Sequence, residues 1–296
     1  MNIGSLSVPK IDIRCQRHVQ AQKIPTGGLF MADADVSLGE EFRSHGFLAP
    51  NINLIEDQIR SEFGDVIKLL RDINTLLTKL VVQAASDTES KSTLDPKVIA
   101  VVSGLRTLGN LQGVIILFQK GMASESKILI RCMYENAFCM GALSEHPEKF
   151  IEMFSSDNRA SKHGIAKSID KYQLNDDQSE RLTQAISSVE KGRYLNIKDV
   201  ADLSALKEAY LFYKHLSDDS MHHSATALSK HLVTDGQNWS GFIYGPAEAE
   251  VLSETAFYCA NSSFSFTVAF AQVLDIRDFQ EEINSMWERV KVITPA

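Results

Sequence analysis

Apolar residues recur every three or four positions along most of the chain after residue 52, which is the spacing of one face of an α-helix. The most regular stretch lies between residues 53 and 86, where the steps alternate between four and three. This alternation predicts a long helix that packs lengthwise on other helices. Its buried seam is expected to consist of Ile59, Phe63, Val66, Leu70, Ile73, Leu77 and Leu80. Small and charged residues at 86–92 end the helix.

The next two helices have clear boundaries. Asp95 supplies an N-cap and Pro96 a first-turn proline for a helix that Gly121 ends. Three glycines inside this helix lower its propensity, which close approach of a neighbouring helix would explain, a kink being the alternative. They are Gly104, Gly109 and Gly113. Residues 128–143 are apolar on nearly all sides, which is typical of a helix in the centre of a bundle.

Further helices and one hairpin are expected in the second half of the chain. Helix-start signals predict four helices, which run from Pro147 to about Tyr172, from Asp176 or Asp177 to about Lys191, from Ser204 through Leu216, and from Pro246 towards Leu274. A last amphipathic stretch carries Ile283, Trp287 and Val290. Asp235-Gly236 lies between β-forming residues and predicts a two-residue hairpin turn.

These elements predict an all-α fold, a bundle of about seven to nine helices with one small β-hairpin near residues 231–244. Residues 1–50 show no steady period and are interrupted by prolines and glycines, so we expect an irregular or partly helical N-terminal arm. Residues 51–296 are expected to form a single helical domain.

Composition limits the classes of partner and the compartment. The net charge of −8 argues against a general nucleic-acid-binding protein, which needs a surplus of Lys and Arg. The four cysteines are scattered without a Cys-x-x-Cys pair, so neither disulfides nor zinc knuckles are expected. The N-terminus lacks the apolar run of a signal peptide. We therefore expect a cytoplasmic protein.

One segment tests the expectation that no part of the chain enters a membrane. Residues 255–274 contain no charged side chain and are long enough to span a bilayer. The same segment carries several polar side chains, including Asn261 and Gln272, which are costly in lipid but normal in a helix surrounded by protein. The pattern favours a buried helix of a soluble protein.

The most polar point of the central apolar segment is the pair Arg131 and Glu135. They are four residues apart and share one helical face. In a helix this apolar both charges are expected to be at least partly buried, and buried charges need partners. The pair is either part of a binding or catalytic site or a structural ion pair that sets helix register.

A second polar segment lies between residues 210 and 224. If it is helical, Tyr213 and Ser217 share a face, and two Asp/His pairs form at the same spacing of four with His222 and His223. Such pairs could orient a histidine base, while the spacings typical of zinc and di-iron sites are absent, so neither a metal nor another cofactor is predicted. These two histidines and His215 titrate near neutrality, which allows a pH-sensitive contact.

Two other side-chain chemistries are weaker. Ser217 lacks the glycine-flanked elbow of a hydrolase nucleophile. Cys132 and Cys139 lie seven apart on one face of the central helix, and their apolar surroundings indicate core packing rather than reactive thiols.

These motifs resemble a known family. The sequence has Arg131-x-x-x-Glu135 on an apolar helix, then Tyr213-x-x-Leu216-Ser217, then His222-x-Ser224-x-x-x-Leu228. This resembles a family of uncharacterised, mostly bacterial helical proteins known only as a domain of unknown function, over roughly residues 95–275. The family pattern has Ser and His four apart, whereas Ser217 and His222 are five apart, which leaves its histidine open between His222 and His223. The resemblance implies an all-helical fold with a shared polar centre and no particular activity.

Two functions follow from these residues. The first is a binding or regulatory protein in which Arg131, Glu135, Tyr213, Ser217 and one of the two histidines hold a small polar or anionic ligand, or support contact with a protein partner or a second copy of the chain. The alternative is an enzyme that cleaves RNA or another phosphodiester, of a bacterial defence or toxin type. Helical ribonucleases of that type have about four to six residues between the Arg and the His, whereas Arg159 and His163 have only three residues between them.

Overall fold

The computed structural model describes residues 36–169, 177–178, 180–181, 184, 191–221, 225–235 and 238–293. It contains ten α-helices with described bounds and one pair of strands, so the all-α fold with a small hairpin is confirmed. The α-helices are α1 (Val36–His45), α2 (Asn53–Asp87), α3 (Pro96–Gln119), α4 (Ala123–Glu145), α5 (Pro147–Ile169), α7 (Ile197–Asp202), α8 (Tyr210–Leu216), α9 (Ala225–Ser229), α10 (Ala249–Val273) and α11 (Gln280–Val290). The strands are β1 (Leu232–Asp235) and β2 (Asn238–Phe242).

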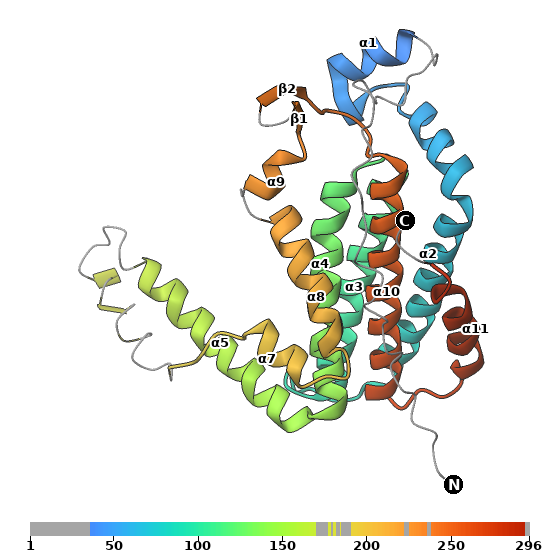
Figure 1. Cartoon of the computed structure of the whole chain (residues 1–296). Helices are drawn as coiled ribbons and strands as arrows, with labels where there is room; N and C mark the ends of the chain where they lie inside the picture. Colours follow the sequence, from blue (N-terminus) through green and yellow to red (C-terminus); the bar gives the residue numbers. More distant parts are fainter. Residues whose placement is uncertain are drawn as a thin grey trace.

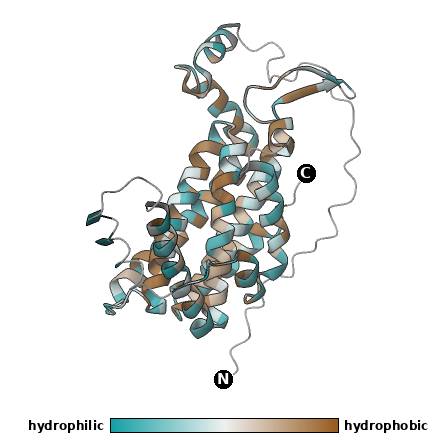
Figure 2. Cartoon of the chain, turned by 90° about the vertical axis from the view of Figure 1, so that its left-hand side faces the viewer, coloured by the Kyte–Doolittle hydropathy of each residue, from teal (hydrophilic) through white to brown (hydrophobic). Residues whose placement is uncertain are grey.

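Helices α2, α3, α4 and α10 lie side by side and form the centre of the bundle (Figure 1). Helix α4 packs most extensively on α10 and α3 and also contacts α5, α7 and α8, which is the central position that its apolar sequence predicted. Figure 2 shows hydrophobic and hydrophilic residues on the same helices, as amphipathic packing requires. The predicted seam of α2 is buried except for Val66, which is partly buried against the core.

The glycines of α3 differ in what surrounds them. A Cβ at Gly104 would lie 2.6 Å from Val81 of α2 and 3.0 Å from Phe270 of α10, and one at Gly113 would lie 2.8 Å from Leu129 of α4. Close helix approach therefore explains these two positions. Gly109 has nothing within 4 Å of the corresponding position, so close approach of a neighbouring helix does not explain this glycine.

The helix ends are closed by local hydrogen bonds. The Asp95 carboxylate accepts the Lys97 N–H at 2.8 Å, which confirms the predicted cap of α3. Helix α2 ends at Asp87, within the small and charged run that was expected to stop it. One residue inside α2, Phe63, has non-helical backbone angles and marks a kink.

The hairpin and the first helices meet at one end of the bundle (Figure 1). Strands β1 and β2 are antiparallel, with Asp235 opposite Asn238, so the hairpin is confirmed, although Asp235 lies in β1 rather than in the turn. The N-terminal arm is described from residue 36 onward, where it forms α1 and a short 3₁₀ turn (Gly46–Leu48). Phe42 of α1 is buried, with its ring 5.5 Å from that of Tyr244 just after β2.

The segment between α5 and α8 differs from the expectation. Ser204 does not directly start a helix: its hydroxyl donates to the Ala201 carbonyl at 3.0 Å, at the end of α7, and accepts the Leu206 N–H at 3.2 Å. Asn196 caps α7 instead, accepting the Lys198 N–H at 2.9 Å. A 3₁₀ turn (Lys207–Ala209) then leads into α8. Most of the helix expected at 176–191 lies outside the described residues.

The uncharged stretch at 255–274 forms most of α10, and its hydroxyl groups are satisfied within the helix. Thr255, Ser262, Ser263 and Thr267 are buried, and each donates to a backbone carbonyl four residues earlier. Within the described ranges one helix, α3, is long and apolar enough to cross a membrane, and 44% of the relevant window is buried. Core helices of soluble proteins share this composition, so the finding is weak evidence.

Candidate functional site

Three charged side chains follow one face of α4 at intervals of four residues. They are Lys127, Arg131 and Glu135, and the face that they share is covered by α8 and by the π-helical turn η4 (Ser217–Met221). Their side-chain exposure rises along the helix, from 2% at Lys127 to 16% at Arg131 and 22% at Glu135. The polar face of α4 therefore begins in the core and opens partly towards solvent.

Arg131 is held by three side chains at once. Its Nη1 lies 3.0 Å from Glu135 Oε1, its Nε donates to Ser217 Oγ at 2.8 Å, and its Nη2 donates to the Tyr213 hydroxyl at 2.7 Å. The guanidinium carbon also lies 4.7 Å from the centroid of the Tyr213 ring. A planar cation packed against an aromatic ring and fixed from three sides has little freedom to reorient. We call Arg131, Glu135, Tyr213 and Ser217 the Arg131 cluster.

The Tyr213 hydroxyl links the two charges of this cluster. It accepts from Arg131 and donates to Glu135 Oε1 at 3.1 Å. Burial and the negative charge of Glu135 raise the pKa of Tyr213 to about 12. The phenol is therefore protonated near neutral pH and acts as a hydrogen-bond donor rather than as a base.

Ser217 stands where α8 changes from α-helical to π-helical geometry. Its hydroxyl donates to the Tyr213 carbonyl at 2.8 Å while accepting from Arg131. In a π turn, residues five apart take the relation that residues four apart have in an α-helix. The turn begins at the residue whose hydroxyl accepts from Arg131.

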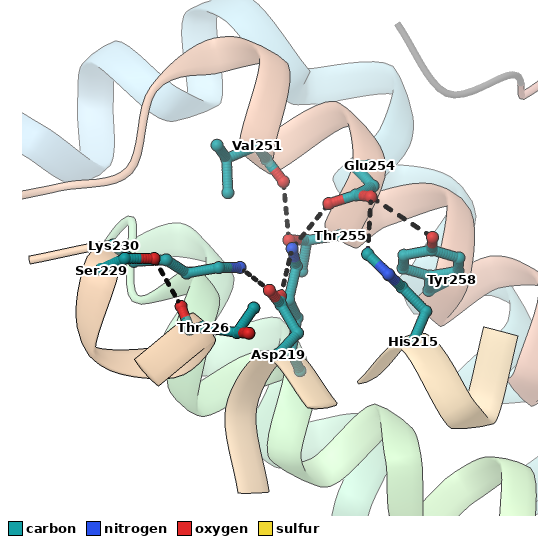
Figure 3. A network of polar contacts seen from close by, with 10 residues as sticks. His215, Asp219, Thr226, Ser229, Lys230, Val251, Glu254, Thr255 and Tyr258 are labelled. Carbon is teal, nitrogen blue, oxygen red and sulfur yellow. Dashed lines mark hydrogen bonds and ion pairs between the residues drawn. The ribbon is translucent and has the colours of Figure 1, made fainter. Parts of the chain in front are cut away.

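A second polar network lies next to the Arg131 cluster, deeper in the bundle (Figure 3). Lys127 Nζ lies 2.6 Å from Glu254 Oε2 of α10 and 3.1 Å from Asp219 Oδ2 of the π turn. Asp219, which is 6% exposed, also pairs with Lys230. Two lysines and two carboxylates thus balance each other in a mostly buried place, and this pairing is what permits their burial.

Glu254 connects this network to α8. Its Oε1 lies 3.5 Å from His215 Nε2 and accepts the Tyr258 hydroxyl at 3.3 Å. Burial alone would raise the pKa of Glu254, but the contacts with His215 and Lys127 outweigh it and lower the pKa to about 2. The same contact with Glu254 raises the pKa of His215. Figure 3 shows the His215 ring and the Glu254 carboxylate pointing toward each other from facing helices.

The sequence interpretation missed this network. Its main signal was present, since Lys127 precedes Arg131 by four residues and continues the charged face of α4. The partners on α10 carried no comparable signal, because Glu254 stands near the start of a helix where acidic residues are common.

Other candidate residues stand apart from these clusters. His222 and His223 lie outside the described residues, as do the Asp/His pairs that include them. Asp219 makes its described contacts with Lys127 and Lys230. Arg159 and His163 lie four residues apart on α5. None of the hydrogen bonds and ion pairs described for the Arg131 cluster involves either of them.

The cysteines of α4 are less buried than expected. Cys132 and Cys139 are both partly exposed rather than fully enclosed, because they lie on the side of α4 that also carries the partly exposed Arg131 and Glu135. Burial, with a smaller contribution from Glu135, nevertheless raises the pKa of the Cys139 thiol to about 12. That thiol is therefore a poor nucleophile at neutral pH.

Comparison with known proteins gives one match. Residues 99–238 match the family described as a family of unknown function (DUF5677), a shorter region than the 95–275 expected from the motifs. No curated protein and no solved structure matches the chain. The matched region contains the whole Arg131 cluster, whereas Glu254 and Tyr258 of the second network lie beyond it. The match covers a little less than half of the chain, and over residues 99–238 the chain is similar to this family of unknown function.

Proposed function

We propose that this protein is a binding protein whose Arg131 cluster holds a small polar ligand through a carboxylate or phosphate group. The observation that carries the proposal is the state of Arg131: its guanidinium is fixed by three neighbours, and its side chain is still 16% exposed. A guanidinium that is held in place but not fully enclosed can present its remaining N–H groups to a ligand.

The hydrogen-bond capacity of Arg131 supports this proposal. A guanidinium has five N–H groups, and the three described contacts use one on each nitrogen. One N–H therefore remains on each terminal nitrogen, which is the number that a carboxylate or phosphate needs for two parallel hydrogen bonds. The three existing contacts reduce the entropy that would otherwise be lost on binding.

Glu135 adds a requirement on the ligand. Both of its described contacts fall on Oε1, so Oε2 remains as an acceptor for a donor group of the ligand. Arg131 and Glu135 together carry no net charge, so long-range attraction of an anion is weak and affinity depends on direct contacts. A compound with an acidic group beside a hydroxyl or amine fits both requirements.

The test uses thermal unfolding and calorimetric titration with a panel of small carboxylates and phosphates that includes glycolate, acetate and inorganic phosphate, at constant ionic strength. At least one member should raise the unfolding temperature in proportion to its saturation, because ligands that bind only the folded state stabilise it by mass action. Glycolate should bind more tightly than acetate, because its hydroxyl can donate to Glu135.

Arg131→Gln should abolish this stabilisation, and Tyr213→Phe should weaken it. Lys214→Gln is the matched control, because Lys214 is the neighbour of Tyr213 but forms an exposed i,i+4 pair with Asp218. The proposal fails if no member of the panel binds, or if Arg131→Gln and Tyr213→Phe both leave the protein unfolded, which would make the cluster structural.

A further inference from the structure

A cavity of about 490 Å³ lies between α5 and the segment that leads into α7, away from the Arg131 cluster. This volume is within the range of small-ligand sites in proteins. One wall is the face of α5 that carries Lys149, Glu152 and Ser156, and the opposite wall carries Arg193 and Asp199. In Figure 1 α7 lies above the part of α5 nearest the bundle, on the side that faces α8.

The cavity has an apolar floor. Met153, Leu195 and Leu203 line it, and all three are partly buried against the main core. The wall at its end is closely packed, since Gly192 lies so near α5 that a Cβ there would overlap the backbone of that helix. The Arg193 N–H donates to Ser156 Oγ at 2.8 Å, which fastens this wall to α5. The segment that forms this wall is therefore attached to α5 through its backbone.

The polar rim offers charges of both signs. Within the ranges that the structure describes, none of the ion pairs uses Lys149, Arg193, Glu152 or Asp199. A third acidic side chain of the rim, Asp202, is neutralised by Lys198 at 2.7 Å. Two cations and two carboxylates thus remain, and the rim carries no net charge.

Two further groups can recognise an amide. Asn196 uses Oδ1 to cap α7, which leaves its Nδ2 group as a donor towards the cavity rim that it lines. Ser156 Oγ accepts from Arg193, and its own O–H can still donate. A ligand with backbone-like carbonyl groups would find donors on both walls.

We infer that this cavity binds a short zwitterionic peptide, with its ammonium group at Glu152 and Asp199, its carboxylate at Lys149 and Arg193, and one apolar side chain on the floor. A ligand of a single charge would satisfy one pair of rim residues and leave the other pair unused. A purely apolar ligand would displace water from the four charged groups and would offer no hydrogen bonds in place of those lost to water. The site is independent of the Arg131 cluster.

The test is calorimetric titration of the full-length protein with the tripeptide Ala-Leu-Ala in four forms: free termini, N-acetylated, C-amidated, and blocked at both ends. The zwitterion should bind most tightly and the doubly blocked form least. The double variant Glu152→Gln, Asp199→Asn should weaken binding of the zwitterion about 5- to 25-fold, because each exposed charge pair contributes up to about fivefold.

Comparing the blocked peptide forms on two variants separates recognition of the peptide termini from a structural effect of the substitutions. In the Glu152→Gln, Asp199→Asn variant the zwitterion should lose its advantage over the N-acetylated form, and in Lys149→Gln, Arg193→Gln its advantage over the C-amidated form. Lys162→Gln, an exposed change elsewhere on α5, should change nothing. Equal binding of all four forms by the unaltered protein, or no binding of any of them, would overturn the inference. Arg131→Gln should leave these affinities unchanged, so this result does not depend on the proposed function.

Discussion

Replacing Lys127 by methionine is expected to lower the free energy of unfolding by about 3–5 kcal/mol at neutral pH, because it removes one member of a buried ion-pair network. The Lys127 side chain is 2% exposed and contacts two carboxylates. Methionine fills most of the same volume, so the loss comes from the charges that are left behind. Asp219 keeps Lys230 and Glu254 keeps His215, which places the expected loss at the lower end of this range.

The assay is urea unfolding followed by circular dichroism, with the slope of the transition used to check that the unfolded state is unchanged. Adding Glu254→Gln to Lys127→Met removes one negative charge as well and should recover at least about 2 kcal/mol, since balanced replacement of a buried pair costs little. Lys198→Met is the control. Lys198 forms an exposed i,i+4 pair with Asp202, and its loss should change stability by less than about 1 kcal/mol. A loss below about 1 kcal/mol for Lys127→Met, or a double variant no more stable than the single one, would refute the reasoning.

Two further predictions test the packing of α3 and the contact between α8 and α10. Gly104→Ala should destabilise the protein by about 1–3 kcal/mol through overlap with neighbouring side chains, whereas Gly109→Ala should stabilise it by up to about 1 kcal/mol through helix propensity. Thermal unfolding of both variants checks this, and the reverse order would contradict the helix packing. Glu254 raises the pKa of His215, so this contact stabilises the fold fully below the unfolded value of about 6.5 and loses its effect as the pH rises through the higher folded value. The stability difference between the unaltered protein and His215→Gln should therefore be larger near pH 6 than above pH 8, and a difference independent of pH would show that the contact is not ionic.

Most of the helices could be predicted because their signals are local. The seam of α2, the Asp95 cap and the β1–β2 hairpin each depend on residues close together in the chain, and each is found in the structure. The prediction that Ser204 starts a helix was wrong, because its hydroxyl bonds both to the Ala201 carbonyl behind it and to the Leu206 N–H ahead of it, and the chain becomes helical again only at Lys207. A local pattern does not specify where after such a serine the helix begins.

The candidate site shows the same division. That Arg131 and Glu135 share a helical face follows from their spacing, and so does the shared face of Tyr213 and Ser217. That the two faces meet, with the Tyr213 hydroxyl between the opposite charges, requires α8 to lie against α4. The π turn that begins at Ser217 could not be expected from a pattern read with helical periods alone.

Three properties could be predicted from the sequence alone: the helical fold class, the central position of the apolar segment around Tyr134, and the requirement that the charged residues of this segment have partners. These properties follow from periodicity and from the cost of burying a charge, and both are set by residues within a few turns of one another. The partners themselves depend on the tertiary structure: Lys127 contacts Glu254, which lies 127 residues later in the chain, and the two walls of the α5–α7 cavity are about forty residues apart in sequence. Such pairings depend on how whole helices pack, and the residue pattern of one helix does not specify which helix packs against it.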